Sequence, residues 1–209
     1  MAVIRVLIAD DHVVFRMGMR LLIHGQADME LCAEAANGTE AVEMYLAMRP
    51  DVVLMDLRMP HTSGIEAIKR LVHHFSQTRV LVLSSFASEE EAYQAMQAGA
   101  RGYLLKDADR EQILSAIRAV ARGEYYLAPP IAALLAERDP RHALTARESE
   151  VIGLMVKGLI NKEIASVLGM SENTVKTHIK QIFRKLDVND RSEAVSAALQ
   201  RGLVFFDNG

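Results

Sequence analysis

The stretch VIRVLIADD, residues 3–11, decides the fold of the first half of the chain, because its apolar run ends abruptly in two aspartates, Asp10 and Asp11. Three later runs repeat this pattern, and each of them also ends in a polar residue. They are DVVLMD at 51–56, RVLVLSS at 79–85 and GYLLK at 102–106. In an open parallel sheet, ligands bind beyond the carboxyl ends of the strands. The four runs therefore predict strands whose polar ends line one pocket.

Helical patterns separate the strand-like runs over the first 122 residues. Strands are expected near 3–9, 29–34, 51–56, 79–84 and 102–105, and helices near 13–24, 38–48, 64–74, 88–98 and 109–122. Strands that alternate with helices of this length indicate βαβ units and a parallel sheet. We therefore expect residues 1–122 to form an α/β domain with a doubly wound, five-stranded parallel sheet in the flavodoxin-like order 2-1-3-4-5. That order places the end of the first strand beside the end of the third.

The polar strand ends carry three carboxylates, a hydroxyl and an ammonium group. The residues are Asp10, Asp11, Asp56, Ser84 and Lys106. Neighbouring strands lie about 4.8 Å apart, so the three carboxylates would crowd together and raise one another's pKa values. A hard divalent cation such as Mg²⁺ relieves that repulsion, and it prefers carboxylate, water and phosphate oxygens. The long side chain of Lys106 could place a positive charge on an anion held there, so the set predicts a site for Mg²⁺ and a phosphoryl group.

The second half of the chain has a different pattern. Residues 123–143 contain three prolines and the short helical pattern IAALLAER, and they are expected to form a partly helical linker. From residue 144 to 209 no strand pattern appears, and four helical segments follow one another within about 65 residues. A tight turn is expected at Gly169, where glycine can end a helix in the left-handed conformation. These features predict an all-α domain of four helices with a helix-turn-helix core.

Residues 171–186 are the most clearly amphipathic segment of the chain. Apolar residues recur at helical spacing and predict one buried face: Val175, Ile179, Ile182 and Leu186. Cationic residues follow another face: Lys176, Lys180 and Arg184. A cationic face with small polar neighbours suits a helix that enters the major groove of double-stranded DNA.

Composition sets limits on the class of protein. The chain has 209 residues, half of them hydrophobic, with a net charge of −3, so bulk charge does not indicate nucleic acid binding. No apolar run approaches the roughly 18 residues of a membrane span, and the N-terminus does not resemble a secretory signal. The single cysteine, Cys32, allows no disulfide within the chain. We therefore expect a cytoplasmic protein without a membrane partner.

The first domain resembles the receiver domain of two-component response regulators over residues 3–122. The matching motifs are ADD at 9–11, LMDLRMP at 54–60, VLVLSSF at 80–86 and AGARGYLLKD at 98–107. The resemblance implies that Asp56 is the phosphoacceptor. It also implies that Mg²⁺ is bound by Asp10, Asp11, Asp56 and the backbone carbonyl of Arg58. In such domains the phosphoryl group is contacted and sensed by residues that correspond here to Ser84, Tyr103 and Lys106.

The second domain resembles the helix-turn-helix of the LuxR/NarL/FixJ class from Leu144 to about Val195. This resemblance implies base contacts by three residues, Lys176, Thr177 and Lys180. It implies DNA backbone contacts by three others, Thr174, Asn161 and Lys162. The last helix is expected to expose a dimer contact formed by Ala194, Ala197, Ala198 and Leu199. A twofold dimer implies a pseudo-palindromic DNA site with half-sites about one helical turn apart.

Together the two halves predict a response regulator of the NarL/FixJ type. A sensor histidine kinase would phosphorylate Asp56, which would promote homodimerisation and DNA binding, with RNA polymerase as a further candidate partner. The only catalysis expected is the protein's own phosphorylation and dephosphorylation. One alternative is an Mg²⁺-dependent phosphohydrolase, although Arg58 stands where such enzymes of the haloacid-dehalogenase type place a second acid. Another is a regulator that ignores phosphorylation.

Overall fold

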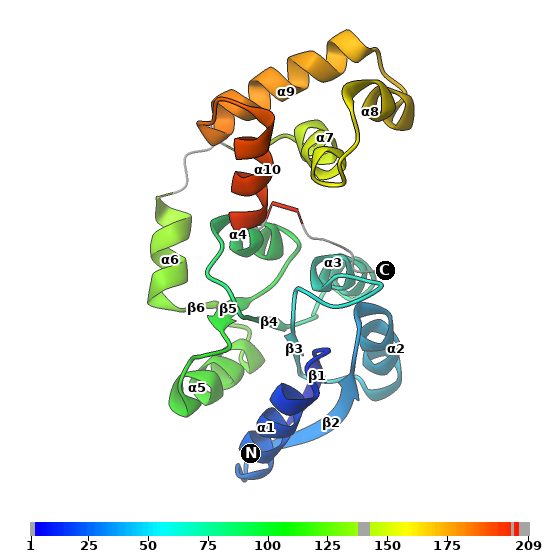
Figure 1. Ribbon diagram of the computed structural model, residues 1–209. Coiled ribbons are helices and arrows are strands. Elements are labelled where there is room, and N and C mark those ends of the chain that lie inside the picture. Colours follow the sequence, from blue (N-terminus) through cyan, green and yellow to red (C-terminus); the bar gives the residue numbers. More distant parts are fainter. Residues whose placement is uncertain (1–2, 138–142, 202, 205–209) are drawn as a thin grey trace. The chain divides into compact units, whose positions relative to one another are not determined.

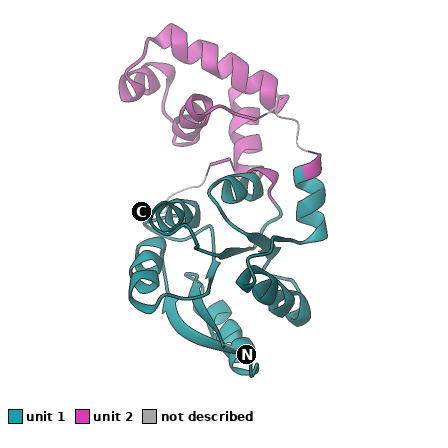
Figure 2. Ribbon diagram, turned by 180° about the vertical axis from the view of Figure 1, so that it is seen from behind, with its two compact units in different colours: residues 1–87, 91–135 teal, residues 88–90, 136–209 magenta. Residues whose placement is uncertain are grey.

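The structure is a computed structural model that describes residues 3–137, 143–201 and 203–204. It divides into two compact units (Figure 2). The first comprises residues 1–87 and 91–135, and the second comprises residues 88–90 and 136–209. The expected linker, 123–143, therefore contributes its first part to the first unit, and its residues 138–142 lie outside the described residues. Among the described helices, none has both the length and the apolar character needed to cross a bilayer.

The first unit contains a parallel sheet in the order β2-β1-β3-β4-β5-β6 (Figure 1). Its strands are β1 (Ile4–Ala9), β2 (Met29–Ala35), β3 (Val52–Met55), β4 (Val80–Ser84), β5 (Gly102–Leu105) and β6 (Tyr126–Leu127). The predicted order 2-1-3-4-5 is confirmed. The prediction of five strands was one short, because the two-residue strand β6 pairs with β5 and is too brief to show a pattern in the sequence.

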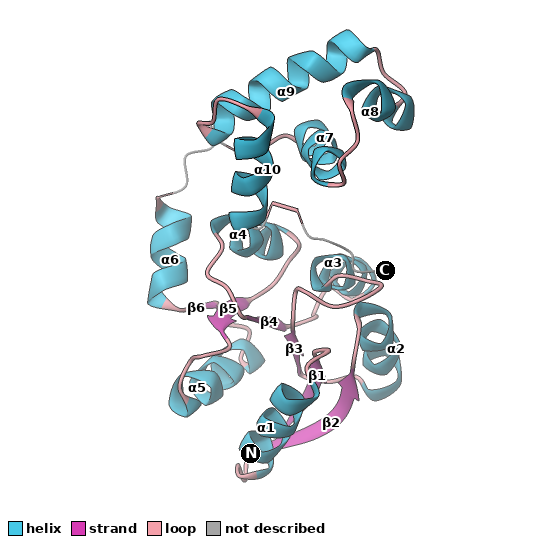
Figure 3. Ribbon diagram, viewed as in Figure 1, coloured by secondary structure: helices cyan, strands magenta, loops and turns pink. Residues whose placement is uncertain are grey.

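Helices cover both faces of this sheet (Figure 3). They are α1 (Val13–His24), α2 (Gly38–Met48), α3 (Gly64–His74), α4 (Glu89–Gln97), α5 (Arg110–Ala121) and α6 (Pro129–Ala136). Alternate strand residues face opposite sides. Val6 and Ile8 of β1 share a buried cluster with residues of α1 and α5, whereas Leu7 and Ala9 share another with residues of α2, α3 and α4. Because both faces are covered, the strands read as continuous apolar runs.

Capping interactions fix where two of these helices begin. The Ser63 side chain accepts a hydrogen bond from the backbone N–H of Glu66 at the start of α3. Asp109 and Gln112 form a reciprocal capping box at the start of α5. Both pairs have the three-residue spacing that is typical of helix caps, and such caps satisfy backbone donors that a helix leaves unpaired.

The described part of the second unit contains four helices around their own apolar core. They are α7 (Ala146–Val156), α8 (Asn161–Leu168), α9 (Glu172–Leu186) and α10 (Arg191–Gln200). Gly169 ends α8 with φ +63°, as predicted for a left-handed C-terminal residue. The predicted apolar face of α9 is buried in the core: Val175, Ile179, Ile182 and Leu186.

Candidate functional site

The three predicted acids converge at the carboxyl ends of the adjacent strands β1 and β3. Asp10 and Asp11 follow β1, and Asp56 follows β3, where its backbone N–H donates to the carbonyl of Ala9 at 2.8 Å. One ligand atom from each of Asp10, Asp11, Asp56 and His12 lies within 4.8 Å of the others. Asp10 and Asp56 are buried, so their charges are poorly screened by water. Parallel pairing of the two strands thus builds an acidic cluster at this edge of the sheet.

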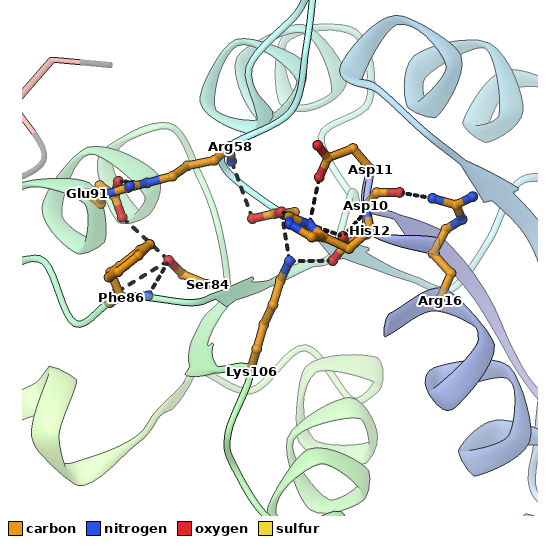
Figure 4. A network of polar contacts seen from close by, with 10 residues as sticks. Asp10, Asp11, His12, Arg16, Arg58, Ser84, Phe86, Glu91 and Lys106 are labelled. Atoms are coloured by element: carbon orange, nitrogen blue, oxygen red, sulfur yellow. Dashed lines mark hydrogen bonds and ion pairs between the residues drawn. The ribbon is translucent and has the colours of Figure 1, made fainter. Parts of the chain in front are cut away.

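Lys106 reaches into the same cluster from the end of β5 (Figure 4). Its Nζ lies 2.7 Å from Asp10 Oδ2 and 2.8 Å from Asp56 Oδ2. Its backbone N–H donates to the carbonyl of Ser84, which fixes the start of the side chain beside β4. The ammonium group also lies 4.8 Å from the centre of the Phe15 ring. The side chain of Lys106 thus reaches from the end of β5 past β4 to the acids that follow β3 and β1.

Burial and the lysine act in opposite directions on these groups. Burial raises the pKa of the Asp56 carboxyl above its usual value, and the hydrogen bond from Lys106 offsets only part of that rise. Burial lowers the pKa of Lys106, but its contacts with Asp10 and Asp56 outweigh this, so its pKa lies above the usual value. The lysine therefore stays cationic at neutral pH beside a carboxylate that burial has made more basic.

Two carboxylate oxygens of the cluster lack a hydrogen-bond partner in the described part of the chain. Asp10 Oδ2 has only the ion pair with Lys106, and Asp11 Oδ1 has only the 2.8 Å contact with His12 Nδ1. A buried carboxylate oxygen without a hydrogen-bond donor is costly unless a cation satisfies it. The donor set, three carboxylates whose oxygens lie within 4.8 Å of one another, fits a divalent metal ion.

Ser84 at the end of β4 contacts a buried residue, Glu91, that was not among the predicted site residues. Its hydroxyl lies 3.4 Å from Oε2 of Glu91, a residue of α4 that is only 1% exposed. The Glu91 carboxylate also accepts a hydrogen bond from the side chain of Arg58. Glu91 was hidden in the acidic run EEE at 89–91, which resembles a solvated helix face. Its four-residue spacing from the buried Ala95 is the signal that could have distinguished it from Glu89 and Glu90.

Tyr103 lies in the middle of β5 and is fully buried. Its hydroxyl donates to the backbone carbonyl of Phe86 at 3.4 Å, in the loop after β4. Burial also raises the pKa of the phenol well above its usual range, so the group stays neutral. The hydroxyl groups of Tyr103 and Ser84 thus both contact the carbonyl of Phe86 in the β4–α4 loop from inside the unit.

Gly64 allows the close approach that positions Asp56. A Cβ atom at this position would lie 2.0 Å from the backbone carbonyl oxygen of Asp56. The N–H of Gly64 donates to the carbonyl of Leu57, which ties the start of α3 to the loop after β3. The start of α3 therefore rests directly on the backbone of the predicted phosphoacceptor.

In the second unit, the residues predicted to contact DNA lie on α9 and at the start of α8. Side chains from α8 and α9 line a groove of about 450 Å³: Asn161, Asn173, Lys176, Thr177, Ile179 and Lys180. Thr174 and Lys162 are exposed but are not among these lining residues. Asn173, whose carbonyl accepts a hydrogen bond from the Thr177 hydroxyl, was not predicted. Lys176 is paired with Glu172 at 3.1 Å on the same face.

The structure corrects the expected exposure of the last helix. Ala194 and Ala198 of α10 are completely buried in the core of the second unit. Ala197 and Leu199 are partly buried and pack against the same core. The prediction that all four residues are exposed was therefore wrong, because alanines suit a tight helix contact within one domain as well as a contact between copies.

Comparisons with known proteins agree with both halves. Residues 6–118 match the family model described as response regulator receiver domain, and residues 142–198 match that of bacterial regulatory proteins, luxR family. The chain is 40% identical to the transcriptional regulatory protein LiaR of Bacillus subtilis strain 168, over 96% of this chain and 99% of LiaR.

Solved structures give the same result. The response regulator ChrA of a heme-sensing two-component system matches with 38% identity and a TM-score of 0.58, over 97% of this chain and 100% of ChrA. The response regulator RcsB in an RcsB–DNA complex matches with 25% identity and a TM-score of 0.68, over 95% of this chain and 98% of RcsB. Receiver domain, acidic strand ends and luxR-type helices thus occur in one chain. The chain belongs to the response regulators of two-component systems, a family of transcriptional regulators, and carries a DNA-binding domain of the luxR family.

Proposed function

We propose that Asp56 accepts a phosphoryl group from a phosphohistidine of a sensor histidine kinase. A carboxylate oxygen of Asp56 forms the new bond to phosphorus as the bond to the histidine nitrogen breaks, and that nitrogen keeps the electron pair. The observation that carries the proposal is the contact of Lys106 Nζ with both Asp56 and Asp10. The ammonium group lies where it can neutralise charge on the oxygens of the transferred group. The same pocket would catalyse only its own phosphorylation and dephosphorylation.

The acidic cluster would bind Mg²⁺ through Asp10, Asp11, Asp56 and the backbone carbonyl of Arg58. The two carboxylate oxygens without hydrogen bonds support this assignment. When bound, the cation supplies positive charge that offsets the charge of the phosphoryl oxygens. The chain itself orients Asp56, through the backbone hydrogen bond to Ala9 and the contact of Gly64 with its carbonyl.

Phosphorylation would act as a switch on the β4–α4 loop. The phosphoryl group adds almost two negative charges and three strong acceptors to Asp56. The Ser84 hydroxyl would leave Glu91 and donate to a phosphoryl oxygen. The β4–α4 loop would then rearrange around Tyr103, which is already buried and hydrogen-bonded to the carbonyl of Phe86. Such a local change of charge can shift an equilibrium between two packing arrangements.

The output would be transcriptional regulation through DNA. Phosphorylation would promote a homodimer that binds a pseudo-palindromic site in double-stranded DNA, with α9 in the major groove. Lys176, Thr177 and Lys180 would contact bases, and three residues would contact the DNA backbone: Thr174, Asn161 and Lys162. RNA polymerase is a further proposed partner of the bound dimer. This activity would take place in the cytoplasm.

The test compares two amide substitutions at opposite ends of β3. The full-length protein is treated with beryllofluoride and Mg²⁺, and its oligomeric state and DNA affinity are measured. The wild type and Asp51→Asn should both form dimers and bind DNA more tightly, because Asp51 is exposed and precedes the strand. Asp56→Asn should show neither response. An unresponsive wild type, or a response that survives in Asp56→Asn, would contradict the proposal.

A further inference from the structure

His12 lies beside the acidic cluster but has no part in the proposed phosphoryl transfer. It is the N-cap residue of α1, yet its side chain makes no capping hydrogen bond. Its backbone N–H donates to Asp10 Oδ1 at 2.9 Å, which holds the residue next to the carboxylates. The side chain is 63% exposed, so it does not belong to the apolar core. Its ring nevertheless turns toward the acids (Figure 4).

The ring nitrogen of His12 lies at hydrogen-bond or ion-pair distance from the three carboxylates, and these distances also match the spacing of ligands in a metal shell. His12 Nδ1 lies 2.8 Å from Asp11 Oδ1, 3.2 Å from Asp10 Oδ1 and 3.9 Å from Asp56 Oδ2. In an octahedral shell with metal–ligand distances of about 2.1 Å, adjacent ligand atoms are about 3.0 Å apart and opposite ones about 4.2 Å. Each of the three distances lies within a few tenths of an ångström of one of these values.

We propose that His12 is a nitrogen ligand of the divalent cation at this site. The inference rests on the metal site of the proposed function and adds to it a fourth side chain and a metal preference. Mg²⁺ is a hard cation that favours oxygen ligands and keeps several waters. Imidazole instead favours transition-metal ions, for which affinity rises from Mn²⁺ to Co²⁺ and beyond. The site therefore favours Mn²⁺ and Co²⁺ over Mg²⁺ more strongly than a site of carboxylates alone.

The direct test is pulsed electron paramagnetic resonance on the full-length protein, stripped of metal and then loaded with Mn²⁺. A coordinated imidazole couples its nitrogen nucleus to the Mn²⁺ spin, and labelling only the histidines with ¹⁵N identifies the source of that coupling. We expect the histidine coupling in the wild type and in His24→Ala, which removes an exposed histidine from the other end of α1. His12→Ala should lose it.

A second readout compares the affinities for two cations without using phosphorylation. By calorimetry, His12→Ala should weaken Co²⁺ binding about tenfold or more and Mg²⁺ binding by less than about threefold. Bound Mn²⁺ without histidine coupling in the wild type would overturn the role of His12 and leave the carboxylate site intact. Failure of the wild type to bind any of the three cations would overturn the metal site of the proposed function as well.

Discussion

Arg58 and Glu91 form an ion pair that joins the loop after β3 to α4, with Arg58 Nε 2.9 Å from Glu91 Oε1. The guanidinium group also lies over the ring of Phe86, 4.4 Å from its centre. The second oxygen of the same carboxylate contacts the Ser84 hydroxyl. One buried acid therefore connects residues next to Asp56 with the hydroxyl that is proposed to sense its phosphorylation.

Removing the Glu91 carboxylate should destabilise the receiver domain. Glu91→Ala removes a hydrogen-bond acceptor from Arg58, which water can partly replace because the Arg58 side chain is 36% exposed, so we expect a loss of about 1–2 kcal/mol in the free energy of unfolding. Glu91→Gln should cost less, because its amide oxygen can still accept the hydrogen bond from Arg58. Urea unfolding, followed by the fluorescence of the tyrosines, all of which precede residue 127, measures both variants. Equal losses of unfolding free energy in the two variants would show that the hydrogen-bond acceptor at residue 91 does not stabilise the domain.

Alanine substitutions at Gly64 and Gly18 form a matched pair that should change the free energy of unfolding in opposite directions. In Gly64→Ala the new methyl group would have to displace the Asp56 carbonyl, so we expect a loss of about 3 kcal/mol or more in unfolding free energy. Gly18 lies inside α1 with no atom within 4 Å of its Cβ position. Gly18→Ala should therefore gain about 0.5–1 kcal/mol from helix propensity. The same urea measurement checks both variants. If Gly64→Ala left the free energy of unfolding unchanged, that would contradict the close approach of Gly64 to the Asp56 carbonyl.

The acidic cluster could be predicted from sequence because buried strands produce unbroken apolar runs. Where such a run stops, the strand has ended, and parallel pairing brings the next residues of neighbouring strands together. Asp10, Asp56 and Lys106 were found in this way. His12 was not, because an exposed residue at a helix start has no periodicity that distinguishes it.

Other features depend on which neighbour a residue meets, which the sequence does not encode locally. Glu91 stands in a run of three acids, and the partners of its buried carboxylate, Arg58 and Ser84 among them, come from other elements of the fold. The strand β6 has two residues and exists because β5 offers it an open edge. The small side chain of Ala194 suits either burial within one domain or a contact between two copies. The packing of the other helices around it determines that it is buried.

The pair of Glu148 and Lys185 predicts how the stability of the DNA-binding domain depends on pH. Glu148 is buried, and Lys185 Nζ lies 2.6 Å from its Oε2. Burial raises the pKa of this carboxyl, but the hydrogen bonds from Lys185 and Thr145 outweigh it and leave the pKa below its usual value. A lowered folded-state pKa means that the stabilisation is fully present above the unfolded value of about 4.3 and is lost as pH falls through the folded value.

Glu148→Gln should therefore destabilise α7 and α9 by about 2 kcal/mol at neutral pH, with a smaller difference from wild type in acid. Hydrogen exchange of peptides from these helices, compared at several pH values, measures the local free energy of unfolding. Glu150→Gln is the control, since Glu150 is an exposed partner of Arg147 on the same helix. A difference between Glu148→Gln and wild type that stays constant below pH 4 would contradict the assigned pKa direction.

Two lysines of the DNA-binding domain should affect DNA binding in different ways. Lys180 lines the groove beside α9 and is proposed to read bases, so Lys180→Ala should cost about 1–3 kcal/mol on the preferred site and less on unrelated DNA. Lys162 lies at the start of α8 and is proposed to contact a phosphate. Lys162→Ala should weaken binding to all sequences alike and reduce the slope of log affinity against log salt by about 0.9.

Lys157→Ala is the control, because Lys157 is exposed at the end of α7 and does not line the groove. Affinities measured on a selected site and on random DNA over a range of salt concentrations separate the two effects. If Lys157→Ala weakened binding as much as the other two substitutions, general positive charge rather than the α8–α9 surface would be responsible.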